Sequence, residues 1–249
     1  MRLRVSVVWC FLLPATLGLA ASPFGRAPWN KQPEKWTLAE TYKILRDSPW
    51  SPAKVAIETT YTQRQTDPVT GIVTESPLHS DTVGLVREVE ISGSRPLASV
   101  SVLWWSSKTI RLAEQRLAQL RANSAASTPL RAEGVPDYVV AVEGEEPMRI
   151  LRGANEDLQQ TVFLELDSGL TLDFTSVKFV GATDSEDART EFHFPRRKDG
   201  QLTIDNKAER VIFHCHAKAK NPLEGHENTI AVRVNFSPKA MRVRNTPDL

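Results

Sequence analysis

Cysteine is nearly absent from this chain of 249 residues, which contains only Cys10 and Cys215. Cys10 lies in an N-terminal segment that resembles a removable signal peptide, so the remaining chain cannot form an internal disulfide, even in an oxidising compartment. Its stability must therefore come from a hydrophobic core, which a chain of this length can bury. The 41% hydrophobic and 24% charged residues exclude collagen, a coiled coil or a wholly disordered chain.

An excess of either charge is also lacking, since 31 basic residues face 30 acidic ones. This balance gives no electrostatic reason to expect nucleic acid or an anionic membrane as a partner. No unit of 20–50 residues repeats, which argues against a solenoid or a propeller. The Gly-x-Ser-x-Gly, His-Glu-x-x-His and glycine-rich phosphate motifs are missing. The sequence therefore assigns no catalytic residue, and we expect binding rather than catalysis.

The N-terminus has the order of features of a secretory signal peptide. Two arginines in the first four residues precede an apolar run that ends at Leu19. The small residues Gly18 and Ala20 then occupy the −3 and −1 positions of a cleavage site before Ala21. No later run is long enough to span a bilayer as a helix. The sequence predicts a signal peptide over residues 1–20 and a periplasmic or secreted protein without a transmembrane segment after cleavage.

The rest of the chain is predicted to be a linker followed by one domain. Residues 21–35 contain three prolines among polar residues, a composition typical of a tether. Residues 36–249 are predicted to form a single α+β domain. An Ala- and Ser-rich stretch near residues 124–136 marks a point at which this domain could be subdivided.

Helical signals are found early and in the centre of the chain. Thr37 and Glu40 fit a capping box, and Pro49 should end that helix after Ser48. Apolar residues at three- and four-residue steps predict a second helix over 110–120. Between these helices, residues 62–81 show turn residues without periodicity and are expected to form a long exposed loop.

Strand signals dominate the last third. Apolar residues alternate with polar ones in two segments that flank Asp167-Ser168-Gly169, which predicts a hairpin. Three more strands are predicted over 190–194, 210–217 and 229–236. Early helices and late hairpins together predict an α+β fold with a mainly antiparallel sheet, two or more helices and a hairpin-rich C-terminal third.

Three segments carry a resemblance to a known group of proteins. They are Asp47-Ser48-Pro49-Trp50, the apolar strand that leads into Trp104, and Phe192-His193-Phe194-Pro195-Arg196. Together with the signal peptide and the closing strand, this pattern resembles a group of uncharacterised exported bacterial proteins with a Ser-Pro-Trp motif. The resemblance implies export and carries no activity, cofactor or residue role to this chain.

Histidines form the best candidate metal site. In a strand, His214 and His216 share one face, and His193 lies on the polar face of another predicted strand. Imidazoles arranged in this way could bind zinc. In the alternative, Cys215 is a buried core thiol and both neighbouring histidines are solvated residues on an exposed face.

Adjacent tryptophans provide a candidate binding site. Trp104 and Trp105 should point to opposite faces of a strand, so one of them is core and the other is able to stack on a sugar or a partner protein. In the alternative, Trp50 and Trp104 only pin the helices to the sheet.

These observations favour a binding or interaction module that is exported and contacts an unknown protein or envelope component. Nucleic acid is not expected as a partner. The alternative is a metal-binding protein or metal-dependent hydrolase that uses His193, His214 and His216. The cofactor of that alternative is zinc, and otherwise no cofactor is expected.

Overall fold

The computed structural model describes residues 27–66, 73–85, 100–122, 129–154, 156–183, 187–205, 207–220 and 227–249, with backbone only at 54–66, 73–85, 220, 227 and 228. The predicted signal peptide and residues 21–26 of the predicted linker lie outside these ranges. The fold is α+β with antiparallel sheets, as predicted. Its helical segments are η1 Pro28–Asn30, η2 Pro33–Lys35, α1 Leu38–Arg46, α2 Lys108–Arg121, α3 Glu145–Gly153 and α4 Leu158–Thr161.

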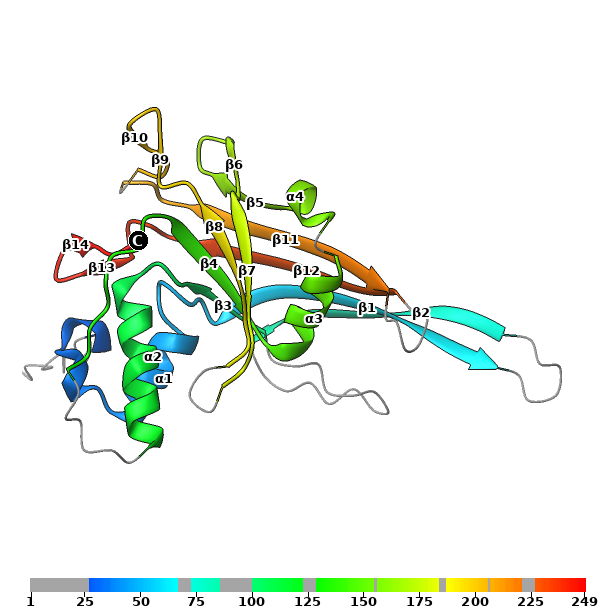
Figure 1. Cartoon of the computed structure of the whole chain (residues 1–249), viewed down its shortest axis with the longest axis horizontal. Coiled ribbons are helices and arrows are strands. Elements are labelled where there is room, and N and C mark those ends of the chain that lie inside the picture. Colours follow the sequence, from blue (N-terminus) through cyan, green and yellow to red (C-terminus); the bar gives the residue numbers. More distant parts are fainter. Residues whose placement is uncertain are drawn as a thin grey trace, which may run out of the picture.

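Two main sheets account for most of the strands (Figure 1). The larger has the order β2-β1-β12-β11-β5-β6, and the smaller has the order β3-β4-β8-β7. The strands of the larger sheet are β1 Lys54–Thr66, β2 Val73–Leu85, β5 Val162–Leu166, β6 Thr171–Asp173, β11 Val211–Lys220 and β12 Glu227–Phe236. Those of the smaller sheet are β3 Ser101–Trp104, β4 Tyr138–Glu143, β7 Ser176–Val180 and β8 Arg189–Phe194. Two short hairpins, β9 Arg197–Lys198 with β10 Gln201–Leu202 and β13 Arg242–Val243 with β14 Thr246–Pro247, complete the fold.

Aromatic side chains hold the two main sheets face to face. The ring of Phe213 on β11 contacts Phe192 and Phe194 on β8, with centroids 5.7 and 6.5 Å away. Trp104 on β3 meets Phe236 on β12 at 5.1 Å. All five rings are fully buried. Because side chains alternate across a strand, the residues next to these rings point away from the core, and both sheets therefore have an outer face.

Side-chain caps begin helices α1 and α2, and the cap of α1 is the one that the sequence predicts. The Thr37 side chain accepts a hydrogen bond from the Glu40 backbone N–H, and Glu40 reaches back to the Thr37 N–H, which completes the capping box. Helix α1 ends at Arg46, just before the predicted stop. Ser107 caps α2 by accepting from the Ile110 N–H. Over the described residues, no helix combines the length and apolarity needed to cross a membrane.

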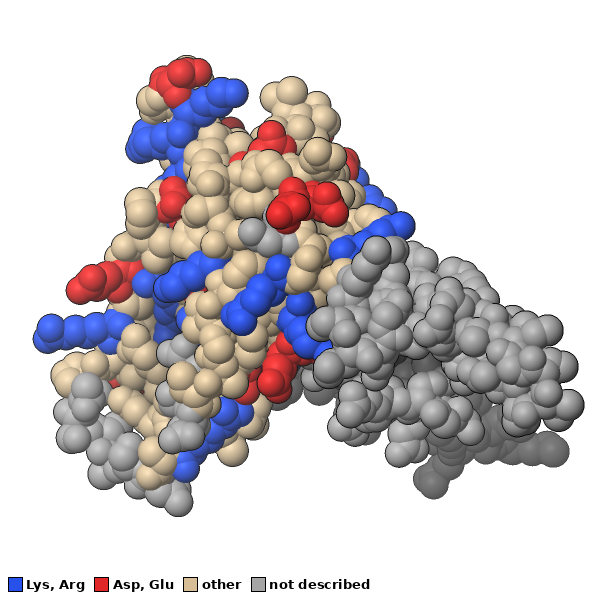
Figure 2. Space-filling model, turned by 45° about the vertical axis from the view of Figure 1, so that its right-hand side comes forward, with Lys and Arg blue, Asp and Glu red and all other residues tan. Residues whose placement is uncertain are grey.

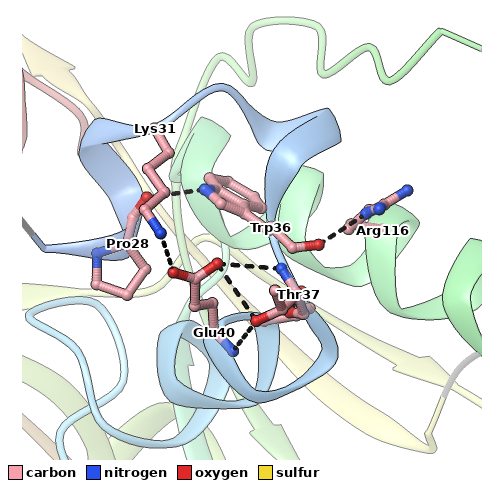
Figure 3. A network of polar contacts seen from close by, with 7 residues as sticks. Pro28, Lys31, Trp36, Thr37, Glu40 and Arg116 are labelled. Atoms are coloured by element: carbon pink, nitrogen blue, oxygen red, sulfur yellow. Dashed lines mark hydrogen bonds and ion pairs between the residues drawn. The ribbon is translucent and has the colours of Figure 1, made fainter.

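The predicted linker is a packed segment over its described part, residues 27–35. Both 3₁₀ helices in it begin with a proline, whose fixed φ suits the first helical position. Trp36 donates an indole hydrogen bond to the Pro28 carbonyl at 2.8 Å, and Lys31 forms an ion pair with Glu40 (Figure 3). Trp29 contacts Trp50 edge to face at 5.6 Å. The prolines therefore start helical turns here and do not keep the chain extended as a tether.

The expected loop over residues 62–81 is wrong for residues 62–66 and 73–81, which belong to β1 and β2, and residues 67–72 lie outside the described ranges. Strands β1 and β2 pair continuously from Lys54–Leu85 to Thr66–Val73, and Pro77 lies within β2. A proline is tolerated there because β2 is the edge strand, where a missing N–H removes no bond from the sheet interior. Threonine-rich polar strands carry no clear apolar alternation, so the periodicity test could not detect them.

The C-terminal predictions are confirmed. Strands β5 and β6 form the expected hairpin, in which Gly169 adopts φ +81°, a left-handed conformation that glycine accepts without strain. Strands β8, β11 and β12 correspond to the three further predicted strands. Strand β7 and helix α3 were not predicted. A single buried core contains residues from both sides of the stretch 124–136.

Candidate functional site

The three histidines of the predicted metal site do not come together. Strand β11 turns Phe213 and Cys215 toward the core, so His214 and His216 lie on the outer face of the larger sheet. Strand β8 turns Phe192 and Phe194 toward the same core, so His193 lies on the outer face of the smaller sheet. Two sheets and the core therefore separate His193 from the other two histidines.

His214 and His216 have different surroundings on their shared face. The His214 Nε2 atom lies 2.9 Å from Glu165 Oε2, and its ring stacks on Phe163 with centroids 4.7 Å apart. His216 is exposed. Within the described ranges, no group of three or more His, Cys, Asp or Glu side chains is arranged to hold a metal ion. His214 is thus part of a cross-strand contact between β11 and β5.

Cys215 is buried in the core, as predicted, with 2% of its surface exposed. Burial disfavours the charged thiolate and raises the pKa of the thiol to about 12. A thiol in this environment remains protonated at neutral pH. It acts as a small apolar core residue between Val232 and Val162, its partners on the neighbouring strands.

Of the two tryptophans considered for binding, Trp104 is fully buried and contacts Phe236 and Tyr138. Trp50 is also fully buried, and its indole donates to the Asp248 carbonyl at 2.6 Å. Both are therefore core residues, and these contacts are to strand and chain-end residues rather than to the helices. Trp105 is half-buried, and the Arg189 guanidinium lies over its ring at 4.0 Å.

Charged side chains gather on the outer face of the smaller sheet, where α1 and α2 approach it. Strands β4 and β8 place Glu143 opposite Arg189, and Glu191 lies two residues further along β8. We define the charged cluster as Arg46 of α1, Glu114 of α2, Glu143, Asp187, Arg189 and Glu191. It combines two cations with four carboxylates. Glu143, Arg189 and Glu191 are each less than one-tenth exposed.

Short ion pairs hold this cluster together. Arg46 donates to Glu143 at 2.6 Å and to Ser101, and its other nitrogen lies 3.5 Å from Asp187. Arg189 donates to Glu191 at 2.7 Å. Buried charges are costly unless they are paired, and these contacts supply the pairing. They also fix the C-terminal end of α1 against strands β3 and β4.

Two carboxyl groups of the charged cluster, those of Glu114 and Glu143, have raised pKa values, and burial is the largest cause in both. Burial, followed by the nearby charge of Glu143, raises the pKa of Glu114 to about 7. Burial raises the pKa of Glu143 as well, and Arg46 opposes that shift. Glu114 is therefore partly protonated at neutral pH. A carboxyl with this pKa can exchange a proton near physiological pH.

His193 borders the charged cluster. Its Nε2 atom lies 3.7 Å from Glu191 and its Nδ1 atom 3.6 Å from Asp137. These are ion-pair distances rather than direct hydrogen bonds. Trp105, through Arg189, borders the same cluster. Two residues singled out from the sequence for separate roles thus belong to one polar network, in which every arginine has a carboxylate partner.

Sequence reasoning did not name the members of this cluster. The alternation in β8 was sufficient to place Arg189, Glu191 and His193 on one face. Two more glutamates follow Glu143 at 145 and 146, a pattern typical of an acidic turn rather than of a strand end. Arg46 and Glu114 gave no local signal. Arg46 pairs with Glu143, which lies 97 residues further along the chain, and Glu114 is affected by the charge of Glu143 without a direct bond to it.

Acidic and basic side chains are interspersed over the described part of the face in Figure 2. This distribution agrees with the near-equal numbers of both charges in the sequence. Comparison with known proteins identifies no relative: no family model, curated protein or solved structure matches this chain.

Proposed function

We propose that this chain is an exported binding protein that holds an extended segment of a partner protein along the hairpin formed by β1 and β2. The observation that carries the proposal is the pairing of β1. Thr60 is the last β1 residue that pairs with β12, and among the described strands residues 61–66 pair only with β2. We call residues 61–78 the hairpin arm, and Figure 1 shows its described parts, residues 61–66 and 73–78, projecting beyond the ends of β11 and β12.

A projecting hairpin offers backbone N–H and C=O groups along its edges. An extended segment can add to such an edge as another strand, and main-chain hydrogen bonds then supply affinity. Proteins usually cover or shorten edges of this kind, because they attract other chains. A long edge that no described strand covers is therefore better explained by a partner than by the stability of the fold.

The two edges of the arm differ. Pro77 removes one donor from β2, on the outer strand of the sheet. Residues 61–66 of β1 contain no proline. Their second edge, which pairs with no other strand over the described ranges, continues the line along which β12 pairs with β1. We therefore assign the partner segment to the β1 edge, where it would extend the ladder beyond Thr60.

A shortened arm tests this proposal. Thr60 and His79 are directly paired, so replacing residues 61–78 with a two-residue Asn-Gly turn should close the hairpin without altering the rest of the sheet. In cells that naturally make the protein, a photo-crosslinking residue at Gln63 should capture one partner. The purified partner should then bind the intact chain and lose at least about tenfold in affinity for the shortened chain.

The matched control is the same crosslinker at Lys239, an exposed position next to the sheet but outside the arm. Equal capture from both positions, or equal affinity for the intact and shortened chains, would contradict the proposal. A crosslink only between two copies of the chain would show that the arm mediates self-association instead.

A further inference from the structure

A second site lies at the other end of the molecule from the arm, on the short hairpin β13–β14. A cavity of about 510 Å³ there is lined by Asn30, Arg242, Arg244 and Asn245. This volume lies within the range of small-molecule sites. Asn30 comes from the packed N-terminal segment, and the other three residues come from the end of the chain, so the cavity forms only when these two parts of the sequence meet.

The guanidinium groups at the cavity are held by their Nε atoms. Arg242 donates from Nε to the Asn245 carbonyl at 3.1 Å, and Arg244 donates from Nε to the Asn30 carbonyl at 3.5 Å. Each arginine therefore keeps its two terminal nitrogens for another acceptor. Among the described residues neither arginine forms an ion pair with a carboxylate, in contrast to Arg46 and Arg189 of the charged cluster.

Asparagine adds further donors. The Asn30 side-chain oxygen already accepts the backbone N–H of Arg244 at 3.1 Å, which leaves its NH₂ group to donate. The described part of the lining thus presents two positive charges and several N–H donors, and it contains no acidic side chain. Such a set is complementary to an oxyanion, because guanidinium groups bind carboxylate and phosphate oxygens in a forked geometry.

The backbone of the hairpin supports a functional role for Arg244. Arg244 and Asn245 are the two turn residues, with φ +47° and +69°. Two-residue hairpin turns of this kind favour Asn and Gly, and a long side chain such as arginine is strained in the left-handed region. Arginine at this position gives up local stability and places its guanidinium at the cavity.

We propose that this cavity binds a small, multiply charged oxyanion. The cavity is larger than one phosphate group requires, so the proposal names a molecule that carries two or more phosphate or carboxylate groups. This site is independent of the hairpin arm.

Isothermal titration calorimetry of the purified protein at low salt tests the proposal, with pyrophosphate, citrate and inorganic phosphate as probes. We expect pyrophosphate or citrate to bind more tightly than inorganic phosphate, and comparing the first two separates phosphate from carboxylate ligands. Arg244→Asn removes the guanidinium but retains a residue suited to positive φ, so the variant should fold. It and Arg242→Gln should each lose at least about tenfold in affinity.

The control is Arg210→Ala, which removes an exposed arginine outside the cavity and should leave binding unchanged. Absence of binding to the unmodified protein at about 5 mM probe would overturn the proposal, because two oriented guanidinium groups should exceed that affinity. Equal losses in all three variants would also overturn it, since they would indicate general electrostatic attraction.

Discussion

Glu114 is partly protonated near neutral pH because it lies on α2 among the other carboxylates of the charged cluster. Its pKa in the folded protein is about 7, above the unfolded value of 4.5. The folded state therefore holds its proton more tightly than the unfolded state does, and the free energy of unfolding should fall as pH rises from about 4.5 to about 7. Deprotonation leaves a buried carboxylate beside Glu143, and this is the physical origin of the loss.

The variant Glu114→Gln tests this coupling. An amide keeps the shape of the protonated carboxyl but cannot ionise, so the variant should be more stable than the unmodified protein at pH 8, by at most about 3 kcal/mol. The two proteins should differ little at pH 4.5. Urea unfolding at both pH values measures the difference, with exposed Glu133→Gln as the control. An unchanged pH dependence in Glu114→Gln would assign the titration to another group.

Cys215 is expected to be chemically inert in the folded protein. Its pKa of about 12 and its place in the core keep the thiol both protonated and out of contact with reagents. A thiol-specific reagent at pH 8 should react slowly with the native protein and rapidly after denaturation. Fast stoichiometric labelling in native buffer would show that β11 opens readily or that the thiol is exposed.

Alternation along strand β11 determines which of its side chains face the core and which lie on the outer face of the sheet. Replacing both His214 and His216 by alanine removes the contact to Glu165 and the stacking on Phe163, but no core packing. We expect a loss of about 1 kcal/mol in the free energy of unfolding, mostly from His214.

Metal binding would change that result. A structural metal site contributes its binding energy to folding, so the loss of two ligands would lower stability far more. Thermal melts of the double variant and of the unmodified protein, each with and without a chelator, measure this. A chelator that lowers the melting temperature of the unmodified protein alone would revive the metal hypothesis.

The N-terminal segment, residues 27–35, packs against the rest of the fold. Trp29 packs against the buried Trp50, and Trp36 is tied to Pro28, so residues 27–35 contribute to the core. Trp29→Ala should lower the free energy of unfolding by roughly 1–3 kcal/mol, less than a fully buried tryptophan would, because the ring is half-buried. Chemical denaturation measures the change. Lys35→Ala, at an exposed position, should have little effect, and equal effects would show that Trp29 is not an anchor.

The order of basic, apolar and small residues at the N-terminus predicts that the whole protein is exported and that its signal peptide is cleaved. We expect the exported protein to begin at or near Ala21, because the small residues before it suit a signal peptidase. N-terminal sequencing of material recovered outside the cytoplasm tests this. Detection of Met1 in that material would contradict cleavage.

The two proposed sites, the hairpin arm and the cavity at hairpin β13–β14, lie at different ends of the molecule. The hairpin arm extends from the larger sheet at one end of the molecule, and hairpin β13–β14 lies at the other end (Figure 1). Residues of that hairpin and of the N-terminal segment line the proposed oxyanion cavity. Loss of one site should leave the other intact. The variant with the shortened arm should therefore bind pyrophosphate or citrate as the unmodified protein does.

Local sequence determined the elements whose signals are contained within a few residues. The capping box at Thr37, the periodicity of α2, the turn at Gly169 and the alternation of β8 and β11 all act over short distances, and the structure contains each of them. The burial of Cys215 followed from the same alternation. These features needed no knowledge of the partners across the core.

Only the tertiary structure decided which faces and strands meet. His193 and His214 satisfied the same strand rule, yet they lie on opposite outer faces because Phe192, Phe194 and Phe213 join the two sheets between them. Arg46 finds Glu143 across 97 residues of chain, and Arg244 finds Asn30 across 214. Contacts of this kind depend on how buried surfaces pack together, and the periodicity of a single segment does not encode them.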